Sequence, residues 1–114
     1  MERVKRLLEV SGLGPKQGIV IHRPSNIFYL SGYTGEGLMV VSRSLAAIVT
    51  DFRYVEQAGQ QAPGFSVHQI STGVSHAQVA ASLILGAGIS EVLYEDDFVT
   101  VKESRKLQDA LGDT

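Results

Sequence analysis

Residues 26–54 read NIFYLSGYTGEGLMVVSRSLAAIVTDFRY. Two apolar runs in this stretch, GLMVVS (37–42) and LAAIVT (45–50), are separated only by the short polar turn Arg43-Ser44. Each run has the length and the apolar composition of a β-strand, so the pair predicts a hairpin. A Gly-rich segment precedes the hairpin, and the polar sequence DFRY (51–54) follows it.

The residues before the hairpin predict one helix and one strand. Residues 1–11 place apolar side chains on one helical face, and Gly12 and Gly14-Pro15 are typical helix stop signals. Residues 18–22 (GIVIH) have the β-branched composition of a buried strand. The segment 26–33 (NIFYLSGY) is aromatic but short, so it is assigned to neither a helix nor a strand.

A helix is expected directly after the hairpin. Asp51 stands in an N-cap position, and the helix would run from Phe52 to about Gln61 and end at Pro63-Gly64. Its inward-facing residues would be Phe52, Val55 and Ala58 or Gly59.

The second half of the chain continues the alternation of strands and helices. Residues 65–70 (FSVHQI) and 91–95 (EVLYE) are interpreted as strands. Ser75–Gln78 has the capping-box form S-x-x-Q, and Thr100–Glu103 has the form T-x-x-E, so each predicts the start of a helix. This order indicates the α/β class, and the hairpin makes the sheet mixed. We expect a three-layer fold with a mixed sheet of about five strands flanked by helices.

The composition is that of one globular domain. The chain has 114 residues, of which 44% are hydrophobic and 19% are charged. A net charge of −2 and the lack of a basic run argue against nucleic acid or an anionic membrane as a partner. No window approaches the roughly 20 apolar residues of a membrane span, and the charged N-terminus is unlike a signal peptide. With no cysteine, the chain fits a cytoplasmic location.

The Gly-rich segment SGYTGEG does not match a phosphate-binding loop. Its glycines at positions 32, 35 and 37 fit neither G-x-G-x-x-G nor the P-loop pattern. Glu36 would also place a negative charge where a phosphate should sit. The glycines therefore predict a turn with unusual φ angles.

Metal binding and nucleophilic catalysis find no support in residue spacing. The three histidines, His22, His68 and His76, have no neighbouring ligands at metal-binding spacing. The acidic run Glu95-Asp96-Asp97 is interpreted as a solvated loop. No G-x-S-x-G nucleophile motif is present. We expect no metal site and no catalytic residue in this chain.

The sequence TDFRY is the strongest candidate for a contact site. It follows a strand, and ligands gather at the carboxyl ends of strands in α/β sheets. Arg53 offers a forked set of donors suited to a carboxylate, and Tyr54 adds an amphipathic ring. The alternative is purely local: Asp51 as a helix cap, Arg53 in a local ion pair and Tyr54 half-buried. A third possibility, a small enzyme that uses these three residues, lacks a general base or nucleophile pair.

These residues also carry a family resemblance. NIFYLSGYTGEG, a hairpin and then TDFRYVEQA closely resemble the N-terminal domain of the creatinase/prolidase family, in its Xaa-Pro aminopeptidase and Xaa-Pro dipeptidase branch. The matching positions are Asn26, Tyr29, Leu30, Ser31, Gly32, Tyr33, Thr34, Gly35, Thr50, Asp51, Arg53, Tyr54, Gln57 and Ala58. Phe52 departs from the pattern, because the family often has Gly there. The likeness covers nearly the whole chain, including the closing stretch VLYEDDFVTVKESRKLQDAL.

The resemblance implies a fold and a larger parent protein. It implies that residues 1–114 form one creatinase/prolidase-type N-terminal domain, without the catalytic pita-bread domain that follows it in the family. That catalytic domain holds two divalent metal ions, commonly manganese or cobalt, and releases an N-terminal residue ahead of proline. We therefore expect this chain alone to hold no cofactor and to have no peptidase activity.

The resemblance also implies a role for the domain. In the family it contributes to dimer or tetramer contacts and to the mouth of the catalytic cleft, so the expected partners are its own catalytic domain, a second subunit and, through the parent, proline-containing peptides. The candidate residues for substrate access or interface contact are Arg53, Tyr54, Tyr33 and Asp51. A free-standing binding or dimerisation module is the alternative function. Whether the parent is an aminopeptidase, a dipeptidase or creatinase-like stays open.

Overall fold

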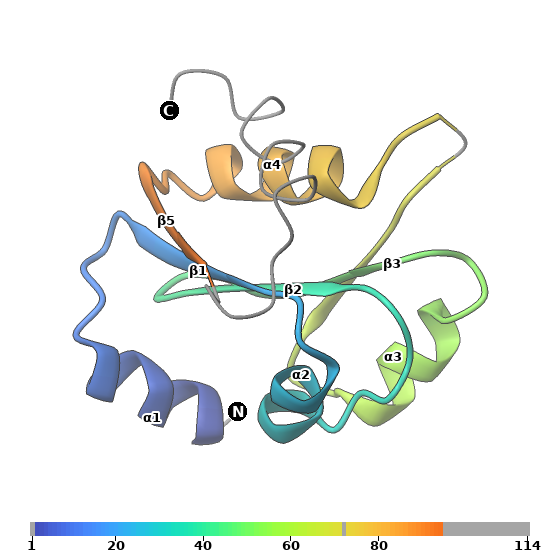
Figure 1. Ribbon diagram of the computed structural model, residues 1–114, viewed down its shortest axis with the longest axis horizontal. Helices are drawn as coiled ribbons and strands as arrows, with labels where there is room; N and C mark the ends of the chain where they lie inside the picture. The colour runs from blue at the N-terminus through green and yellow to red at the C-terminus, as the bar shows by residue number, and fades with distance from the viewer. Residues whose placement is uncertain (1, 72, 95–114) are drawn as a thin grey trace.

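The computed structural model describes residues 2–71 and 73–94 (Figure 1). The helices are α1 (Glu2–Ser11), α2 (Pro24–Ser31), α3 (Val55–Gln61) and α4 (His76–Gly86). The strands are β1 (Gln17–Ile21), β2 (Leu38–Ser42), β3 (Ala46–Thr50), β4 (Ser66–Gln69) and β5 (Glu91–Tyr94). The strands form one sheet in the order β4-β3-β2-β1-β5. The three central strands are antiparallel, and β4 and β5 add to them in parallel, so the prediction of a mixed sheet is confirmed.

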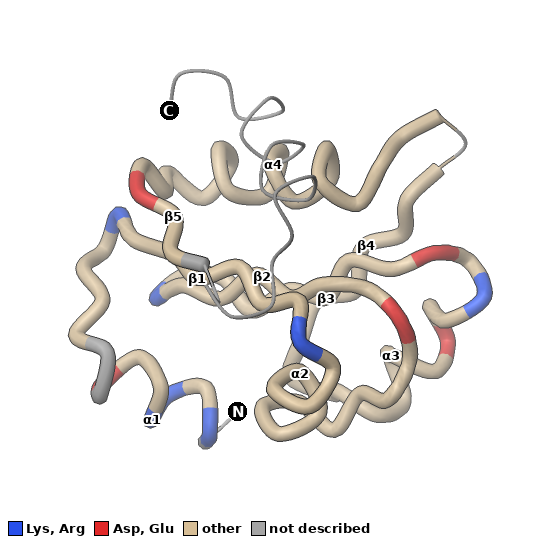
Figure 2. The backbone as a smooth tube through the Cα atoms, in the orientation of Figure 1, with Lys and Arg blue, Asp and Glu red and all other residues tan. Residues whose placement is uncertain are grey.

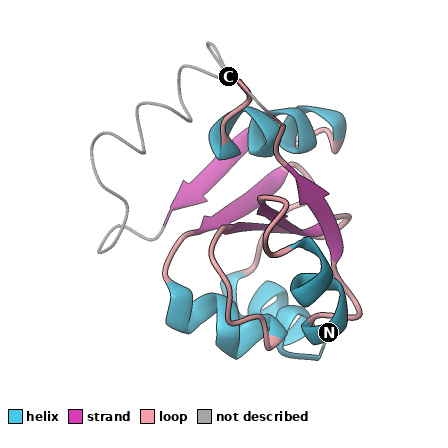
Figure 3. Ribbon diagram, turned by 90° about the vertical axis from the view of Figure 1, so that its right-hand side faces the viewer, coloured by secondary structure: helices cyan, strands magenta, loops and turns pink. Residues whose placement is uncertain are grey.

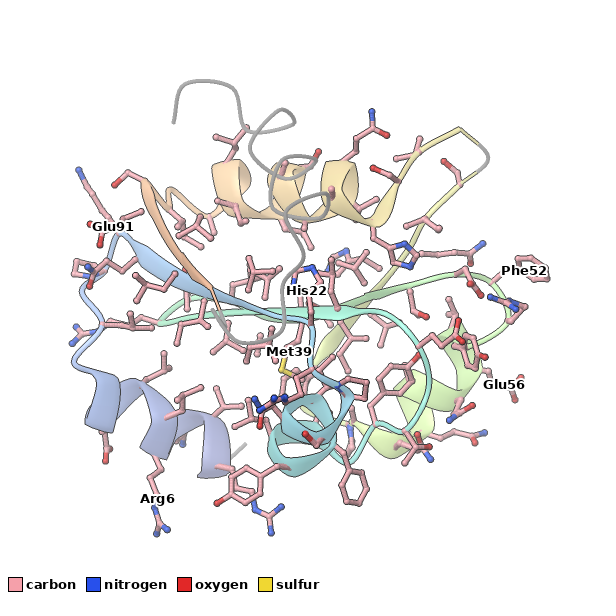
Figure 4. All side chains as sticks on the ribbon, in the orientation of Figure 1. Arg6, His22, Met39, Phe52, Glu56 and Glu91 are labelled. Carbon is pink, nitrogen blue, oxygen red and sulfur yellow. The ribbon has the colours of Figure 1, made fainter. Side chains whose placement is uncertain are left out.

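The sheet lies between two layers of helices, as the sequence predicted. Helix α4 covers one face, and α1, α2 and α3 cover the other (Figures 1 and 3). Strand β2 is buried along its full length, because it is central and both of its faces are covered. Met39 and Val41 pack on the side of the three helices, and Leu38 and Val40 pack on the side of α4. Figure 4 shows the Met39 side chain between the sheet and α2.

Helix α2 is the segment that the sequence left unassigned. Pro24 occupies its first turn, and Gly32 ends it in the left-handed conformation with φ 85°. Ile27 and Leu30 are buried, whereas the neighbouring Phe28 is 53% exposed. The aromatic residues therefore lie outside the buried face of the helix. For this reason the spacing of the apolar residues in the sequence does not show the helical period.

The segment after the hairpin differs from the prediction. Helix α3 begins at Val55, and Tyr54 is its N-cap residue, so the prediction that Asp51 caps this helix is wrong. The Asp51 carboxylate instead accepts the Arg53 backbone N–H at 2.9 Å, and its carbonyl accepts the Tyr54 N–H at 3.0 Å. This turn delays the helix by three residues and directs Phe52 outward with 76% exposure, so the inward placement of Phe52 was also wrong.

The capping box at the start of α4 is confirmed. The Ser75 hydroxyl accepts the Gln78 N–H at 3.2 Å, and the Gln78 side chain accepts the Ser75 N–H at 2.8 Å. The helix predicted from Thr100 and the acidic loop at residues 95–97 lie outside the described residues.

The loop between α2 and β2 is held by two buried hydroxyl groups. Tyr33 is 1% exposed, and its hydroxyl donates to the Glu36 carbonyl at 2.6 Å. The Thr50 hydroxyl, at the end of β3, donates to the same carbonyl at 2.7 Å and lies 3.1 Å from the Tyr33 hydroxyl. One backbone oxygen therefore joins the loop to the end of the hairpin.

Two glycines make this close approach possible. Gly37 has φ 142°, and a Cβ atom there would overlap the Val49 carbonyl oxygen. A Cβ atom at Gly35 would lie 2.5 Å from the Tyr33 hydroxyl and 2.7 Å from Cδ1 of Tyr54. Both positions therefore favour glycine for steric reasons, and the predicted unusual φ angles occur at Gly32 and Gly37 but not at Gly35.

We expect Gly37→Ala to destabilise the domain by at least about 2 kcal/mol, because it forces a side chain into a strained backbone region and against β3. The matched control is Gly59→Ala in α3, where a new Cβ meets nothing within 4 Å. That change should stabilise the domain by about 0.5–1 kcal/mol through helix propensity. Urea unfolding measures both. Equal free energies of unfolding for the two variants would contradict the steric explanation.

Candidate functional site

The Gly-rich loop and the DFRY turn meet at one end of the sheet. Strands β2 and β3 are antiparallel, and Leu38 pairs with Val49 in their register. The residues before β2 and after β3 are therefore neighbours in space (Figure 1). We call residues 32–37 and 51–54 together the polar edge.

Asp51 and Arg53 form a two-pronged ion pair within the polar edge. Arg53 Nη2 lies 2.8 Å from Asp51 Oδ2, and Arg53 Nε lies 3.1 Å from Asp51 Oδ1. These hydrogen bonds from the guanidinium, together with that from the Arg53 backbone, hold the pKa of the Asp51 carboxyl below its ordinary value. The same contacts raise the pKa of Arg53. The pair fixes the direction of the Arg53 side chain at the surface.

Glu36 adds a second carboxylate to this group. Its Oε2 atom lies 3.6 Å from Arg53 Nη2, and 73% of its side chain is exposed. Arg53 also stacks over the Tyr54 ring, with 5.3 Å from Cζ to the ring centroid. Two carboxylates and one guanidinium sum to a formal charge of −1 for Glu36, Asp51 and Arg53. The sequence analysis treated Glu36 only as an argument against phosphate; its place as the one charged residue in a Gly-rich loop was the available signal.

A second set of hydrogen bonds ties the loop to α3. The Thr34 N–H donates to Gln61 Oε1 at 3.0 Å, and Gln57 Nε2 donates to the Thr34 hydroxyl at 3.0 Å. In the sequence analysis Gln57 was part of the family motif but had no assigned role, and Gln61 was not identified as a site residue. The polar edge is therefore braced by α3 on one side and by the buried hydroxyls of Tyr33 and Thr50 on the other.

The structure brings the four predicted residues together, but Tyr33 differs from the other three. Burial raises the pKa of the Tyr33 phenol, which stays a neutral donor inside the domain. A side chain so deeply buried presents no surface to a cleft or a subunit, so Tyr33 positions the loop. Asp51, Arg53 and Tyr54 lie at the surface, with Tyr54 half-buried. Their contacts in this structure lie within the polar edge, and a role in contacts with another domain or subunit stays a prediction.

A pocket opens between α2, the Gly-rich loop and α3. Its volume is about 420 Å³. Its walls include Pro24, Ile27, Thr34, Glu36, Tyr54 and Gln57. A second pocket of about 390 Å³ lies between α1, β1 and α2, and its lining includes Arg3, Arg6 and Leu7.

Within residues 2–71 and 73–94, no group of three or more His, Asp or Glu side chains could hold a metal ion. In the same part of the chain, no helix is long and apolar enough to cross a bilayer.

Comparisons with known proteins support the resemblance. A family model for the creatinase/prolidase N-terminal domain matches residues 1–114. The uncharacterized peptidase YqhT of Bacillus subtilis is 36% identical over 101 residues, which are 88% of this chain and 27% of that protein.

Solved structures show the same similarity to Xaa-Pro peptidases. An Xaa-Pro dipeptidase from Bacillus anthracis is 28% identical with a TM-score of 0.82, over 96% of this chain and 30% of that one. The N-terminal domain of the cytoplasmic peptidase PepQ from Mycobacterium tuberculosis H37Rv is 31% identical with a TM-score of 0.78, over 96% of this chain and 82% of that one. The chain thus spans less than a third of the B. subtilis and B. anthracis relatives. By sequence over residues 1–114, and by its fold, this chain belongs to the creatinase/prolidase N-terminal domain family.

Proposed function

We propose that this chain acts as the non-catalytic N-terminal domain of an Xaa-Pro peptidase, a metal-dependent hydrolase that releases an N-terminal residue ahead of proline. In this proposal the domain supports subunit assembly and shapes substrate access to the active site of the catalytic domain. The main observation behind this proposal is the polar edge, in which hydrogen bonds hold a loop and a turn in place at one end of the sheet. The similarity to an Xaa-Pro dipeptidase over 30% of that protein supports the reaction class.

The chemistry of bond cleavage would belong to the catalytic domain. Two divalent metal ions, manganese or cobalt, would supply a Lewis acid and an activated water there. The described residues of this chain contain no matching group of ligands, so we assign them no step in the reaction. Their contribution would be to support subunit assembly and to orient and select the peptides that reach the active site.

The surface chemistry of the polar edge suits a contact with another domain or subunit. Phe52 is 76% exposed, beside Arg53 and Tyr54. Figure 4 shows Phe52 and Glu56 projecting at this end of the molecule. Aromatic residues and arginine are enriched at protein interfaces, where they act as anchors. We therefore infer that the partners are the catalytic domain and a second subunit, in the cytoplasm.

The bracing of the polar edge supports a role in access. A loop held by buried hydroxyls on one side and by glutamines on the other loses little conformational freedom when a partner or a peptide binds. A rigid polar edge beside the catalytic cleft would also limit the size of the peptides that enter it.

Arg53→Ala should lower kcat/KM for an Xaa-Pro peptide by about fivefold or more, or weaken the oligomer, in the protein that joins this domain to its catalytic domain. The matched control is Arg43→Ala, an exposed arginine in the hairpin turn at the other end of β2 and β3. It should change kcat/KM by less than about twofold. Steady-state kinetics and analytical ultracentrifugation measure the two effects. An Arg53→Ala variant with unchanged kcat/KM and unchanged assembly would sink the contact role.

The Asp51–Arg53 pair predicts a specific pH dependence. Because the pKa of Asp51 is lowered in the folded chain, its carboxylate favours the folded state at pH values above its ordinary pKa of 3.8. That contribution is lost as the pH falls through the lower folded value. We expect a carbon-detected NMR titration of the Asp51 carboxyl to give a midpoint below 3.8, and Arg53→Ala to move it upward. Arg43→Ala should leave it in place; a wild-type midpoint at or above 3.8 would contradict the ion pair.

A further inference from the structure

We propose that the pocket between α1, β1 and α2 is a binding site for a small carboxylate with an apolar body, that is, an aliphatic or aryl-alkanoic acid in its ionised form. No residue of the polar edge lines this pocket, so the site is separate from the contact surface of the proposed function. In this site Arg3 and Arg6 would hold the carboxylate, and the apolar walls would hold the rest of the ligand.

The walls of the pocket are apolar and include part of the sheet. Its volume of about 390 Å³ falls within the range of small-molecule sites, about 300–1,000 Å³. The apolar residues come from all three elements: Leu7 from α1, Ile19 and Ile21 from β1, and Leu30 from α2. Two of them, Ile21 and Leu30, belong to the buried core. A ligand body that covers these walls would remove apolar surface from water, which favours binding.

The charged groups in the lining are guanidinium groups. Among the described residues, the lining contains Arg3 and Arg6 but no Asp or Glu. The ion pairs of the described side chains both involve Arg53, so in that part of the chain neither Arg3 nor Arg6 is paired with a carboxylate. Figure 2 shows basic segments in α1, away from the acidic segments in the loop before β2 and in the turn after β3. The charge of the lining therefore favours an anion over a cation.

Arg3 is already held at the opening of the pocket. Its Nη1 atom donates to the Tyr29 carbonyl at 2.7 Å, and its Cζ atom lies 4.5 Å from the centroid of the Tyr29 ring, which is exposed. A guanidinium has five N–H donors, so further donors stay available for a carboxylate. Because the side chain is held before a ligand arrives, it loses less conformational freedom on binding.

Arg6 places a second guanidinium close to the first. It lies three residues after Arg3 in α1, so the two side chains are neighbours on one face of the helix. Like charges on neighbouring positions of one helix face repel each other. A carboxylate between them would accept hydrogen bonds from both groups and would offset this repulsion. Figure 4 shows Arg6 extending from α1 into solvent, where a ligand can reach it.

The test is an amide-detected NMR titration of the 114-residue chain at neutral pH with hydrocinnamate, a carboxylate joined to a phenyl ring by two methylene groups. We expect saturable shifts with a Kd on the order of 1–10 mM. The shifts should occur at the lining residues Arg6, Leu7, Ile19 and Leu30.

Two compounds separate the contributions of charge and body. Hydrocinnamamide has the same body without the charge, and propionate has the charge without the ring. Each should bind at least about fivefold more weakly than hydrocinnamate. Binding of either compound as tight as that of hydrocinnamate, or no saturable shift at the lining residues, would overturn the proposal.

Variants assign the binding to the guanidinium groups. Arg6→Gln should weaken hydrocinnamate binding at least about fivefold, and Arg6→Lys should retain part of it, because lysine keeps the charge without the forked donors. The matched control is Lys5→Gln, which removes an exposed cation from the same helix but outside the pocket lining. It should change the Kd by less than about twofold. An effect of Lys5→Gln as large as that of Arg6→Gln would show general attraction of anions to α1 and would contradict a specific site.

The pocket beside Glu36 provides an internal control in the same titration. Its charged lining residue is a carboxylate, so it should not attract hydrocinnamate. The amides of Gly35 and Gly37, which line that pocket, should therefore keep their shifts. Shifts at these two glycines as large as those at Arg6 would show unspecific binding and would also reject the site.

Thermal unfolding gives a second measurement. A ligand in this pocket would contact α1, β1 and α2 together and bind only the folded chain, so it should stabilise the domain. At about ten times its Kd, hydrocinnamate should raise Tm by about 2–5 °C. Hydrocinnamamide at the same concentration should give a smaller rise, and a rise of equal size would contradict the role of the arginines.

Discussion

The hydrogen bonds to the Glu36 carbonyl are the constraint on which the polar edge depends. A carbonyl oxygen has two lone pairs, and here both are used by hydroxyl groups, from Tyr33 and Thr50. Each buried hydroxyl would be costly without a partner, so the three groups stabilise one another. The chain can reach this arrangement only if Gly35 and Gly37 carry no side chain. The course of the loop, the start of β2 and the place of the DFRY turn all follow from it.

Much of the fold could be predicted because its signals are local in the sequence. The hairpin and the capping box at Ser75 each depend on residues a few positions apart. Helix α2 was not assigned because its aromatic residues point outward and mask the buried pair Ile27 and Leu30. Asp51 was misassigned because an Asp accepts a backbone N–H two residues later in a turn as readily as at a helix N-cap. The turn and the N-cap differ only in whether the helix begins directly after the Asp or a few residues later.

The candidate site was predicted in part for the same reason. Asp51, Arg53 and Tyr54 are adjacent in the chain, so their proximity needed no tertiary structure. The burial of Tyr33 depends on its contact with Thr50, 17 residues away, and the bracing by Gln61 spans 27 residues. Contacts at such separations have no periodic signal in a single sequence. The ion pair between Glu36 and Arg53 likewise joins two separate segments of the chain.

The polar edge separates the groups that set its shape from the groups that set its chemistry. Its backbone is fixed by glycines and by buried hydroxyls, which tolerate little change. The side chains of Glu36 and Phe52 extend into solvent and take no part in the buried core. A substitution of either side chain would therefore change the surface of the edge and leave the buried hydrogen bonds of the Glu36 carbonyl in place. The shape of the edge and its surface chemistry thus reside in different residues and can vary independently of each other.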